Sequence, residues 1–223
     1  MKVAVAVFPG TNCETDTKYA FEKLGADVEL VFHKEDVLPA GTDLVVLPGG
    51  FSYGDDLRSA AIAKFSPIMN AVISYANRGG KVLGICNGFQ MLLEAKLLPG
   101  AMKRNQNTHF ISKYQHLKVM DTQNTFLSQL QKDDIINIPI AHGEGNYFID
   151  ESGLKSLYDN HQVLLEYCDK DGNTENPNGS VGAIACICNQ EKNIFGLMPH
   201  PERAIETILG SSDGAKMLEG FFK

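Results

Sequence analysis

The chain has 223 residues, of which 43% are hydrophobic and 21% are charged, which is ordinary for a globular protein. Its net charge is −7, and the lysines and arginines are scattered, which argues against a nucleic-acid-binding surface. No apolar run is long enough to span a bilayer. The apolar start MKVAVAVF leads directly into the polar TNCETDTK, so we expect a buried first strand, no signal peptide and a cytoplasmic protein.

The first half of the chain alternates strand-like and helix-like segments. The apolar run at residues 3–8 predicts a strand buried on both faces, and further strands are predicted at residues 28–32, 43–48 and 81–85. After the first strand we expect a helix that Thr11 or Asn12 caps and Gly25 ends. A second helical stretch, reaching Asn77, is expected to break at Pro67. This alternation is typical of a parallel sheet covered by helices on both faces.

The second half is less regular and contains turn signals such as DKDGN and NPNGS. Strand-like runs are HFISKYQHLKVM, IINIPIAH, VLLEYC, SVGAIACIC and NIFGLMP, and a last helix is expected around residues 214–222. We interpret these strands as antiparallel additions to the sheet. With no linker or repeat, residues 1–223 are expected to form a single α/β domain. Its expected core is a flavodoxin-like, mainly parallel sheet with helices on both faces and added antiparallel strands.

The five cysteines show neither CxxC spacing nor a cluster with zinc-ligand spacing, so the sequence predicts no metal site. Three of them lie in strand-like runs and are expected to be small buried residues: Cys168, Cys186 and Cys188.

The segment KVLGICNGFQ places a fourth cysteine, Cys86, where a strand changes into a helix. Gly84 and Gly88 flank it at two residues' distance, which is the spacing of a nucleophile elbow. Larger side chains at the two glycines would collide with the neighbouring strand and helix. The N-terminus of the helix favours a thiolate. We therefore predict that Cys86 is a nucleophile; the alternative is a buried cysteine in a tight turn.

A cysteine nucleophile requires a base, and His200 is the best candidate among the six histidines. It ends the strand-like run NIFGLMP, and Glu202 follows two residues later, where an extended backbone would let it orient the imidazole. The alternative is a surface ion pair. The N–H groups of Asn87 and Gly50 are expected to form an oxyanion hole. His142, among glycines in AHGEGNY, is a further candidate to line a site.

The segments PGGFSYGD, GICNGFQ and MPHPER together resemble the triad-type (class I) glutamine amidotransferases. The segments FPGTNCE, AHGEGNY and NPNGS narrow the resemblance to a free-standing glutaminase subunit of purine biosynthesis, and the likeness extends from Pro9 to Arg203. The resemblance implies the same roles for Cys86, His200 and Glu202. It further implies that the substrate glutamine is held by Gln90, Gly143 and Glu144.

Ammonia released by such an enzyme must be used by a second active site. The sequence contains neither a GxxxxGK[ST] loop nor a GxGxxG segment after a strand, so we expect no cofactor in this chain. The resemblance implies a large synthetase subunit that carries ATP and Mg²⁺, and it leaves open a small accessory subunit.

Three other interpretations remain open at this stage. The first is another elbow-cysteine hydrolase of similar fold, such as a peptidase or a DJ-1-like protein. The second is an amidotransferase subunit that serves a different synthetase. The third is a binding subunit that has kept the fold and lost the activity.

Overall fold

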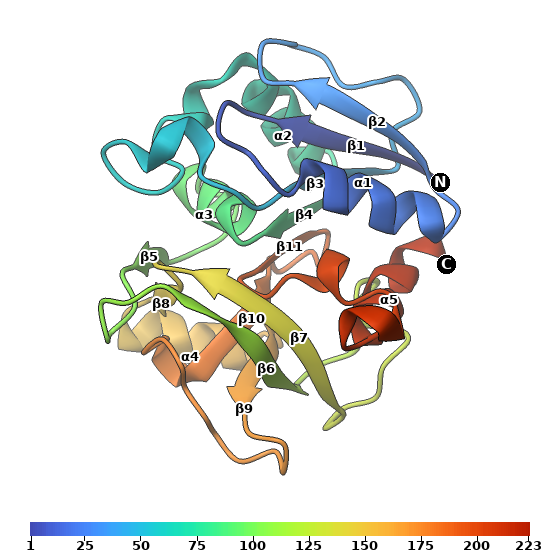
Figure 1. Ribbon diagram of the computed structural model, residues 1–223. Helices are drawn as coiled ribbons and strands as arrows, with labels where there is room; N and C mark the ends of the chain where they lie inside the picture. Colours follow the sequence, from blue (N-terminus) through green and yellow to red (C-terminus); the bar gives the residue numbers. More distant parts are fainter.

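The computed structural model describes all 223 residues, and a nine-stranded sheet runs through it (Figure 1). The strand order is β2-β1-β3-β4-β11-β10-β9-β6-β7. The strands are β1 (Lys2–Val7), β2 (Asp27–Phe32), β3 (Leu44–Leu47), β4 (Lys81–Ile85), β6 (Ile111–Val119), β7 (Ile135–His142), β9 (Val163–Cys168), β10 (Ile184–Cys188) and β11 (Ile194–Leu197). A separate two-stranded sheet pairs β5 (Ala101–Lys103) with β8 (Asn146–Phe148).

The first five strands of this order are parallel to one another. Leu47 of β3 pairs with Gly84 of β4, and Ile85 of β4 pairs with Leu197 of β11. The carboxyl ends of β3, β4 and β11 therefore lie side by side at one edge of the sheet. Ligands bind at this edge in open α/β sheets.

Helices cover both faces of the parallel half, with α1 on one face and α2 and α3 on the other, while α5, on the same side as α1, packs against the turn Pro201–Arg203 and β7 (Figure 1). Strands covered in this way are apolar throughout, and all four residues of β3 are buried. The helices are α1 (Glu14–Lys23), α2 (Pro67–Asn77), α3 (Asn87–Glu94), α4 (Glu151–Asp159) and α5 (Asp213–Leu218). Short 3₁₀ turns are at Ser52–Asp55, Ala63–Phe65, Val181–Ala183, Pro201–Arg203, Thr207–Leu209 and Glu219–Phe222.

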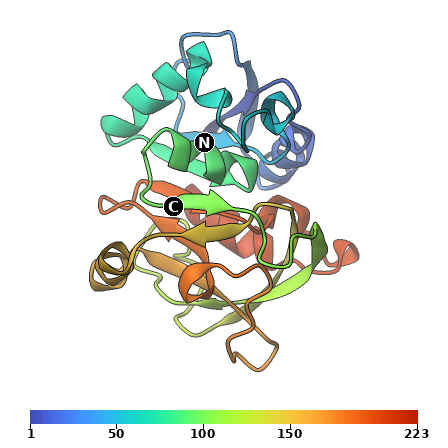
Figure 2. The same cartoon turned by 90° about the vertical axis from the view of Figure 1, so that its left-hand side faces the viewer.

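Figure 2 shows the parallel half above and the antiparallel half, formed by β10, β9, β6 and β7, below. The residues of β7 alternate between half-buried and buried, as expected for a strand with one face on the core. One continuous hydrophobic core includes Val3 in the first half and Ile136 in the second. The α/β class and the mainly parallel sheet with antiparallel additions are confirmed.

Several local expectations were wrong. Pro67 does not break a helix but begins α2. At the first position of a helix no hydrogen bond within the helix requires an N–H group, so proline fits there. Neither Thr11 nor Asn12 caps α1, whose N-cap is Cys13. The run NIFGLMP forms β11, which is parallel to β4 and not antiparallel.

No helix is both long and apolar enough to cross a membrane. That residues 1–223 form a single domain stays a prediction.

Candidate active site

Three neighbouring strands each deliver one part of the candidate site. Gly49 follows β3, Cys86 follows β4, and His200 lies just beyond the end of β11. A methyl group built on Gly49 would lie 2.8 Å from Cε1 of His200 and 3.4 Å from Cβ of Cys86. The thiol-bearing turn and the imidazole therefore meet at the same edge of the sheet, as the sequence predicts.

Cys86 has backbone dihedrals of φ 51° and ψ −106°, a strained conformation between β4 and α3. The flanking glycines make this turn possible. A Cβ on Gly84 would lie 2.6 Å from the carbonyl oxygen of Gly88, and a Cβ on Gly88 would lie 1.9 Å from that of Leu47 in β3. The expected collisions are therefore present, and the turn has the geometry of a nucleophile elbow.

His200 and Glu202 form a buried pair in which Nδ1 of the imidazole lies 2.7 Å from Oε1 of the carboxylate. The backbone between them is a 3₁₀ turn, Pro201–Arg203, and not the extended segment that we expected. Burial lowers the pKa of His200, but Glu202 and Cys86 outweigh it and hold that pKa well above its ordinary value. The second ring nitrogen, Nε2, is buried and has no hydrogen-bond partner in the chain.

The two expected oxyanion donors belong to neighbouring turns. Gly50 follows β3, and Asn87 is the first residue of α3. The side-chain oxygen of Asn87 accepts a hydrogen bond from the backbone N–H of Ser52 at 3.0 Å. This bond fixes the loop after β3 against the start of α3, so the two donors have a defined relative position.

A cavity of about 190 Å³ opens over Cys86. It brings together the three residues expected to hold substrate, Gln90, Gly143 and Glu144. The amide of Gln90 donates to the backbone oxygen of Glu144 at 2.7 Å and accepts from Nδ2 of Asn87 at 2.8 Å. Gln90 is therefore held rigidly at the side of the cavity.

The cavity also contains Cys13, to which the sequence analysis assigned no role. Ligand atoms of Cys13, His200 and Glu202 lie within 4.8 Å of one another, a spacing that a metal ion could use. However, Nη2 of Arg203 lies 3.2 Å from the Cys13 sulfur, and a guanidinium at this distance disfavours a second cation. Burial raises the pKa of Cys13, which keeps it a neutral thiol. The FPGTNCE segment was its only signal in the sequence.

The other expected positions are also accounted for. His142 lines the cavity. Its pKa is lowered to about 4, mainly by burial and to a smaller extent by the charge of the neighbouring His200. Cys168, Cys186 and Cys188 are buried and unpaired, as expected. The cavity wall also includes Asp55, Ser59 and Phe110, which were not predicted from the sequence. Asp55 lies in the quoted GGFSYGD loop, so an acidic residue close to the oxyanion glycine was an available signal.

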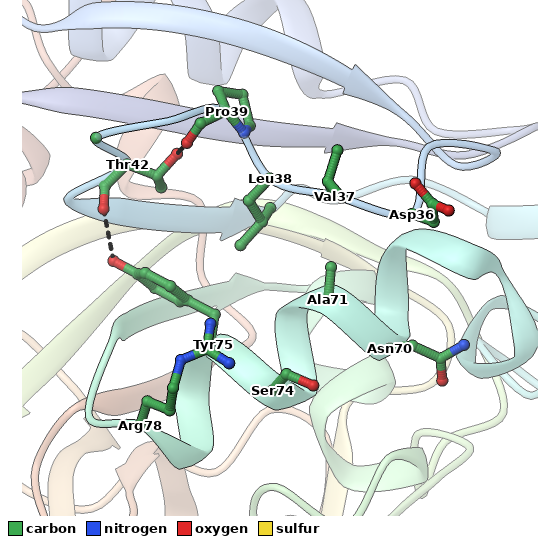
Figure 3. A pocket seen from close by; sticks show the side chains of 11 residues that line it. Asp36, Val37, Leu38, Pro39, Thr42, Asn70, Ala71, Ser74, Tyr75 and Arg78 are labelled. Atoms are coloured by element: carbon green, nitrogen blue, oxygen red, sulfur yellow. Dashed lines mark hydrogen bonds between the residues drawn. The ribbon is translucent and has the colours of Figure 1, made fainter.

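A second hollow, of about 540 Å³, lies between the loop before β3 and helix α2 (Figure 3). The hydroxyl of Tyr75 donates to the carbonyl oxygen of Thr42 at 3.1 Å across it. This second hollow shares no lining residue with the cavity over Cys86, and neither a cysteine nor a histidine lines it.

Residues 1–217 match the family described as the CobB/CobQ-like glutamine amidotransferase domain. The chain belongs to this family. Its membership removes the peptidase-like and DJ-1-like alternatives.

Individual relatives give a narrower likeness. The chain is 65% identical, over the whole of both chains, to the phosphoribosylformylglycinamidine synthase subunit PurQ of Sulfurimonas denitrificans. It is 60% identical to the subunit of the same name from Campylobacter jejuni, over 99% of this chain and 96% of the relative.

A solved structure described as PurLQS from Thermotoga maritima matches with a TM-score of 0.89 and 39% identity, over 99% of this chain and 97% of the matched chain. A second structure from Thermotoga maritima, described as a glutamine amidotransferase, matches with a TM-score of 0.60 at 15% identity, over 93% of this chain and 79% of the matched chain. At this low identity the second match shows a shared fold only.

Proposed function

We propose that this chain is the glutaminase subunit of phosphoribosylformylglycinamidine synthase. It hydrolyses glutamine and supplies ammonia to an ATP-dependent synthetase subunit, which converts formylglycinamide ribonucleotide to formylglycinamidine ribonucleotide. The likeness to PurQ subunits over the full length of both chains supports the choice of synthetase. The observation that carries the chemistry is the convergence of Cys86 and the buried His200–Glu202 pair at one edge of the sheet.

The first half of the reaction forms a thioester. The Cys86 thiolate attacks the side-chain carbonyl carbon of glutamine, and the negative charge moves to the oxygen. The N–H groups of Gly50 and Asn87 stabilise this oxyanion, each by about 3 kcal/mol. His200 donates its Nε2 proton to the leaving amine, the C–N bond breaks, and ammonia departs.

The second half of the reaction hydrolyses the thioester. His200, now neutral, accepts a proton from water as the water oxygen attacks the acyl carbon, and glutamate leaves as the Cys86 thiolate re-forms. Throughout, Glu202 orients the ring through Nδ1 and stabilises its positive charge. Gln90 and the Gly143–Glu144 backbone position the glutamine.

Ammonia in water near neutral pH is mostly protonated and is then no nucleophile, so the acceptor reaction must take place close by. We propose a complex with a large synthetase subunit that holds ATP and Mg²⁺ and with a small accessory subunit, in the cytoplasm. The Thermotoga maritima structure described as PurLQS supports such a complex. That this chain itself carries no cofactor stays a prediction.

The test is purification of the chain from its native cell with whatever binds it, followed by an assay with glutamine, formylglycinamide ribonucleotide and ATP. We expect the complex to form formylglycinamidine ribonucleotide and the isolated chain to hydrolyse glutamine more slowly. A complex that uses glutamine for a different acceptor would identify another synthetase. Equal glutamine turnover with and without the partner would contradict the proposed coupling.

A further inference from the structure

The segment NPNGS, residues 176–180, contacts the loop between β7 and β8 from outside the cavity over Cys86. Its central residue, Asn178, is fully buried. Nδ2 of Asn178 donates to the carbonyl oxygen of Gly145 at 2.8 Å, and Oδ1 accepts from the backbone N–H of Ser180 at 3.0 Å. These two bonds tie the NPNGS turn to the β7–β8 loop.

A second buried asparagine, Asn105, holds the same loop. Its Oδ1 accepts from the backbone N–H of Gly145 at 3.0 Å, and its Nδ2 donates to the carbonyl oxygen of His142 at 2.8 Å. The backbone N–H of Asn105 donates to the carbonyl oxygen of Gly143 at 2.9 Å. Both polar backbone groups of Gly145 are therefore bonded to asparagine side chains, and neither asparagine lines the cavity.

The loop Gly143–Gly145 depends on such support because of its sequence. It belongs to no strand, since β7 ends at His142 and β8 begins at Asn146. A Gly-Glu-Gly segment loses more conformational entropy on ordering than most segments of three residues. A buried backbone group without a partner is also costly, so each bond to an asparagine favours the one conformation in which it is made.

This loop forms part of the wall of the catalytic cavity. Gly143 and Glu144 line the cavity, so the conformation of the loop decides the shape of that wall. A wall that is already ordered binds a ligand more tightly, because binding then does not include the entropy cost of ordering it. The two asparagines can therefore act on the substrate only through the loop.

We propose that Asn105 and Asn178 are positioning residues that fix the backbone of Gly143–Gly145 in one conformation and so set the affinity for the substrate without touching it. This inference rests on the proposed glutaminase function. Removal of one of these buried hydrogen bonds is expected to lower the affinity for glutamine about 10-fold.

The test measures KM and kcat for glutamine in the full-length chain, alone and with its synthetase. Asn178→Asp replaces one NH₂ group by an oxygen and leaves the shape of the side chain nearly unchanged. It keeps the acceptor for the N–H of Ser180 and removes the donor to the carbonyl oxygen of Gly145.

Asn193→Asp is the matched control. Asn193 is also a buried asparagine, and its Nδ2 donates to two backbone carbonyl oxygens, those of Ala76 at 3.0 Å and Gly80 at 2.8 Å. It does not line the cavity and has no bond to the Gly143–Gly145 loop. The control therefore carries the same chemical change and a similar loss of folding stability at a distant place.

We expect Asn178→Asp to raise KM for glutamine about 10-fold and to change kcat less than about threefold, because the ground state and the transition state lose the same support. Asn193→Asp should change KM less than about twofold. A merely structural role would reduce the folded fraction, so a fall in kcat at unchanged KM would overturn the inference. An equal rise of KM in Asn193→Asp would do the same.

Asn105→Asp keeps the folding question separate. It removes the donor to the carbonyl oxygen of His142 and keeps an acceptor for the N–H of Gly145. If Asn178→Asp does not fold, Asn105→Asp is expected to raise KM in the same way, and an unchanged KM in this variant would overturn the inference.

Calorimetric titration of glutamine into a Cys86→Ala chain separates this inference from the proposed function. In that background, adding Asn178→Asp should weaken the binding of glutamine about 10-fold, and adding Asn193→Asp should leave it unchanged. If glutamine binds in this Asn178-dependent way but the wild-type chain does not hydrolyse it, the inference holds and the glutaminase proposal fails. If glutamine is hydrolysed but neither its binding nor its KM depends on Asn178, the inference fails alone.

Discussion

At the scale of single residues, Cys86 combines a strained backbone with a position beside a paired imidazole. The strain is held by the β4–α3 junction, where neither flanking glycine has room for a Cβ. The local pattern Gly-x-Cys-x-Gly was enough to predict this turn. Cys13 was not predicted as part of the site, because it reaches the cavity from a loop that only the tertiary fold brings to Cys86. Asp55 was missed although it lies in the same loop as Gly50, which was predicted.

Glu202 favours the charged form of His200, so removing the negative charge of Glu202 should change how activity depends on pH. The pKa of His200 is lowered by burial but raised more strongly by Glu202 and Cys86. Glu202→Gln removes the carboxylate charge that raises the pKa of His200, so the imidazolium loses its proton at lower pH. We expect the alkaline limb of the kcat/KM profile for glutamine to move to lower pH and the rate to fall. An alkaline limb at the same pH in the variant would show that Glu202 does not govern this proton.

At the scale of elements, the site depends on three adjacent parallel strands ending at one edge. Periodicity and strand-to-helix spacing predicted β3 and β4, and β4 was located to the residue. The same information did not predict that β11 is parallel to β4, because strand direction depends on long-range pairing. Helix α4 was also missed: its nine residues begin with Glu-Ser-Gly, and only Leu157 among them is buried.

The packing of α3 on β3 depends on Gly88. A Cβ there would overlap the carbonyl oxygen of Leu47 at 1.9 Å, so α3 would have to move away from the sheet. We expect Gly88→Ala to lower the free energy of unfolding by about 3 kcal/mol or more. Gly143→Ala is the matched control, because its Cβ would meet only a phenylalanine carbon at 3.7 Å. Equal effects of the two substitutions, measured by denaturant unfolding, would refute this account of the junction.

At the scale of the whole molecule, one sheet and one hydrophobic core connect the parallel and antiparallel halves. We therefore predict that residues 1–223 unfold as a single cooperative unit. Scanning calorimetry should give one transition in which the calorimetric and van't Hoff enthalpies agree. Two separable transitions, one for each half, would indicate two domains.

The whole account depends on Cys86 being the thiol that attacks glutamine, although Cys13 lines the same cavity. The most direct test is to treat the chain with a diazo-ketone analogue of glutamine and to locate the covalent adduct by peptide mass spectrometry. We predict one adduct per chain, on Cys86, whose formation glutamine prevents and Cys86→Ala abolishes. An adduct on Cys13, or labelling that persists in Cys86→Ala, would contradict the account.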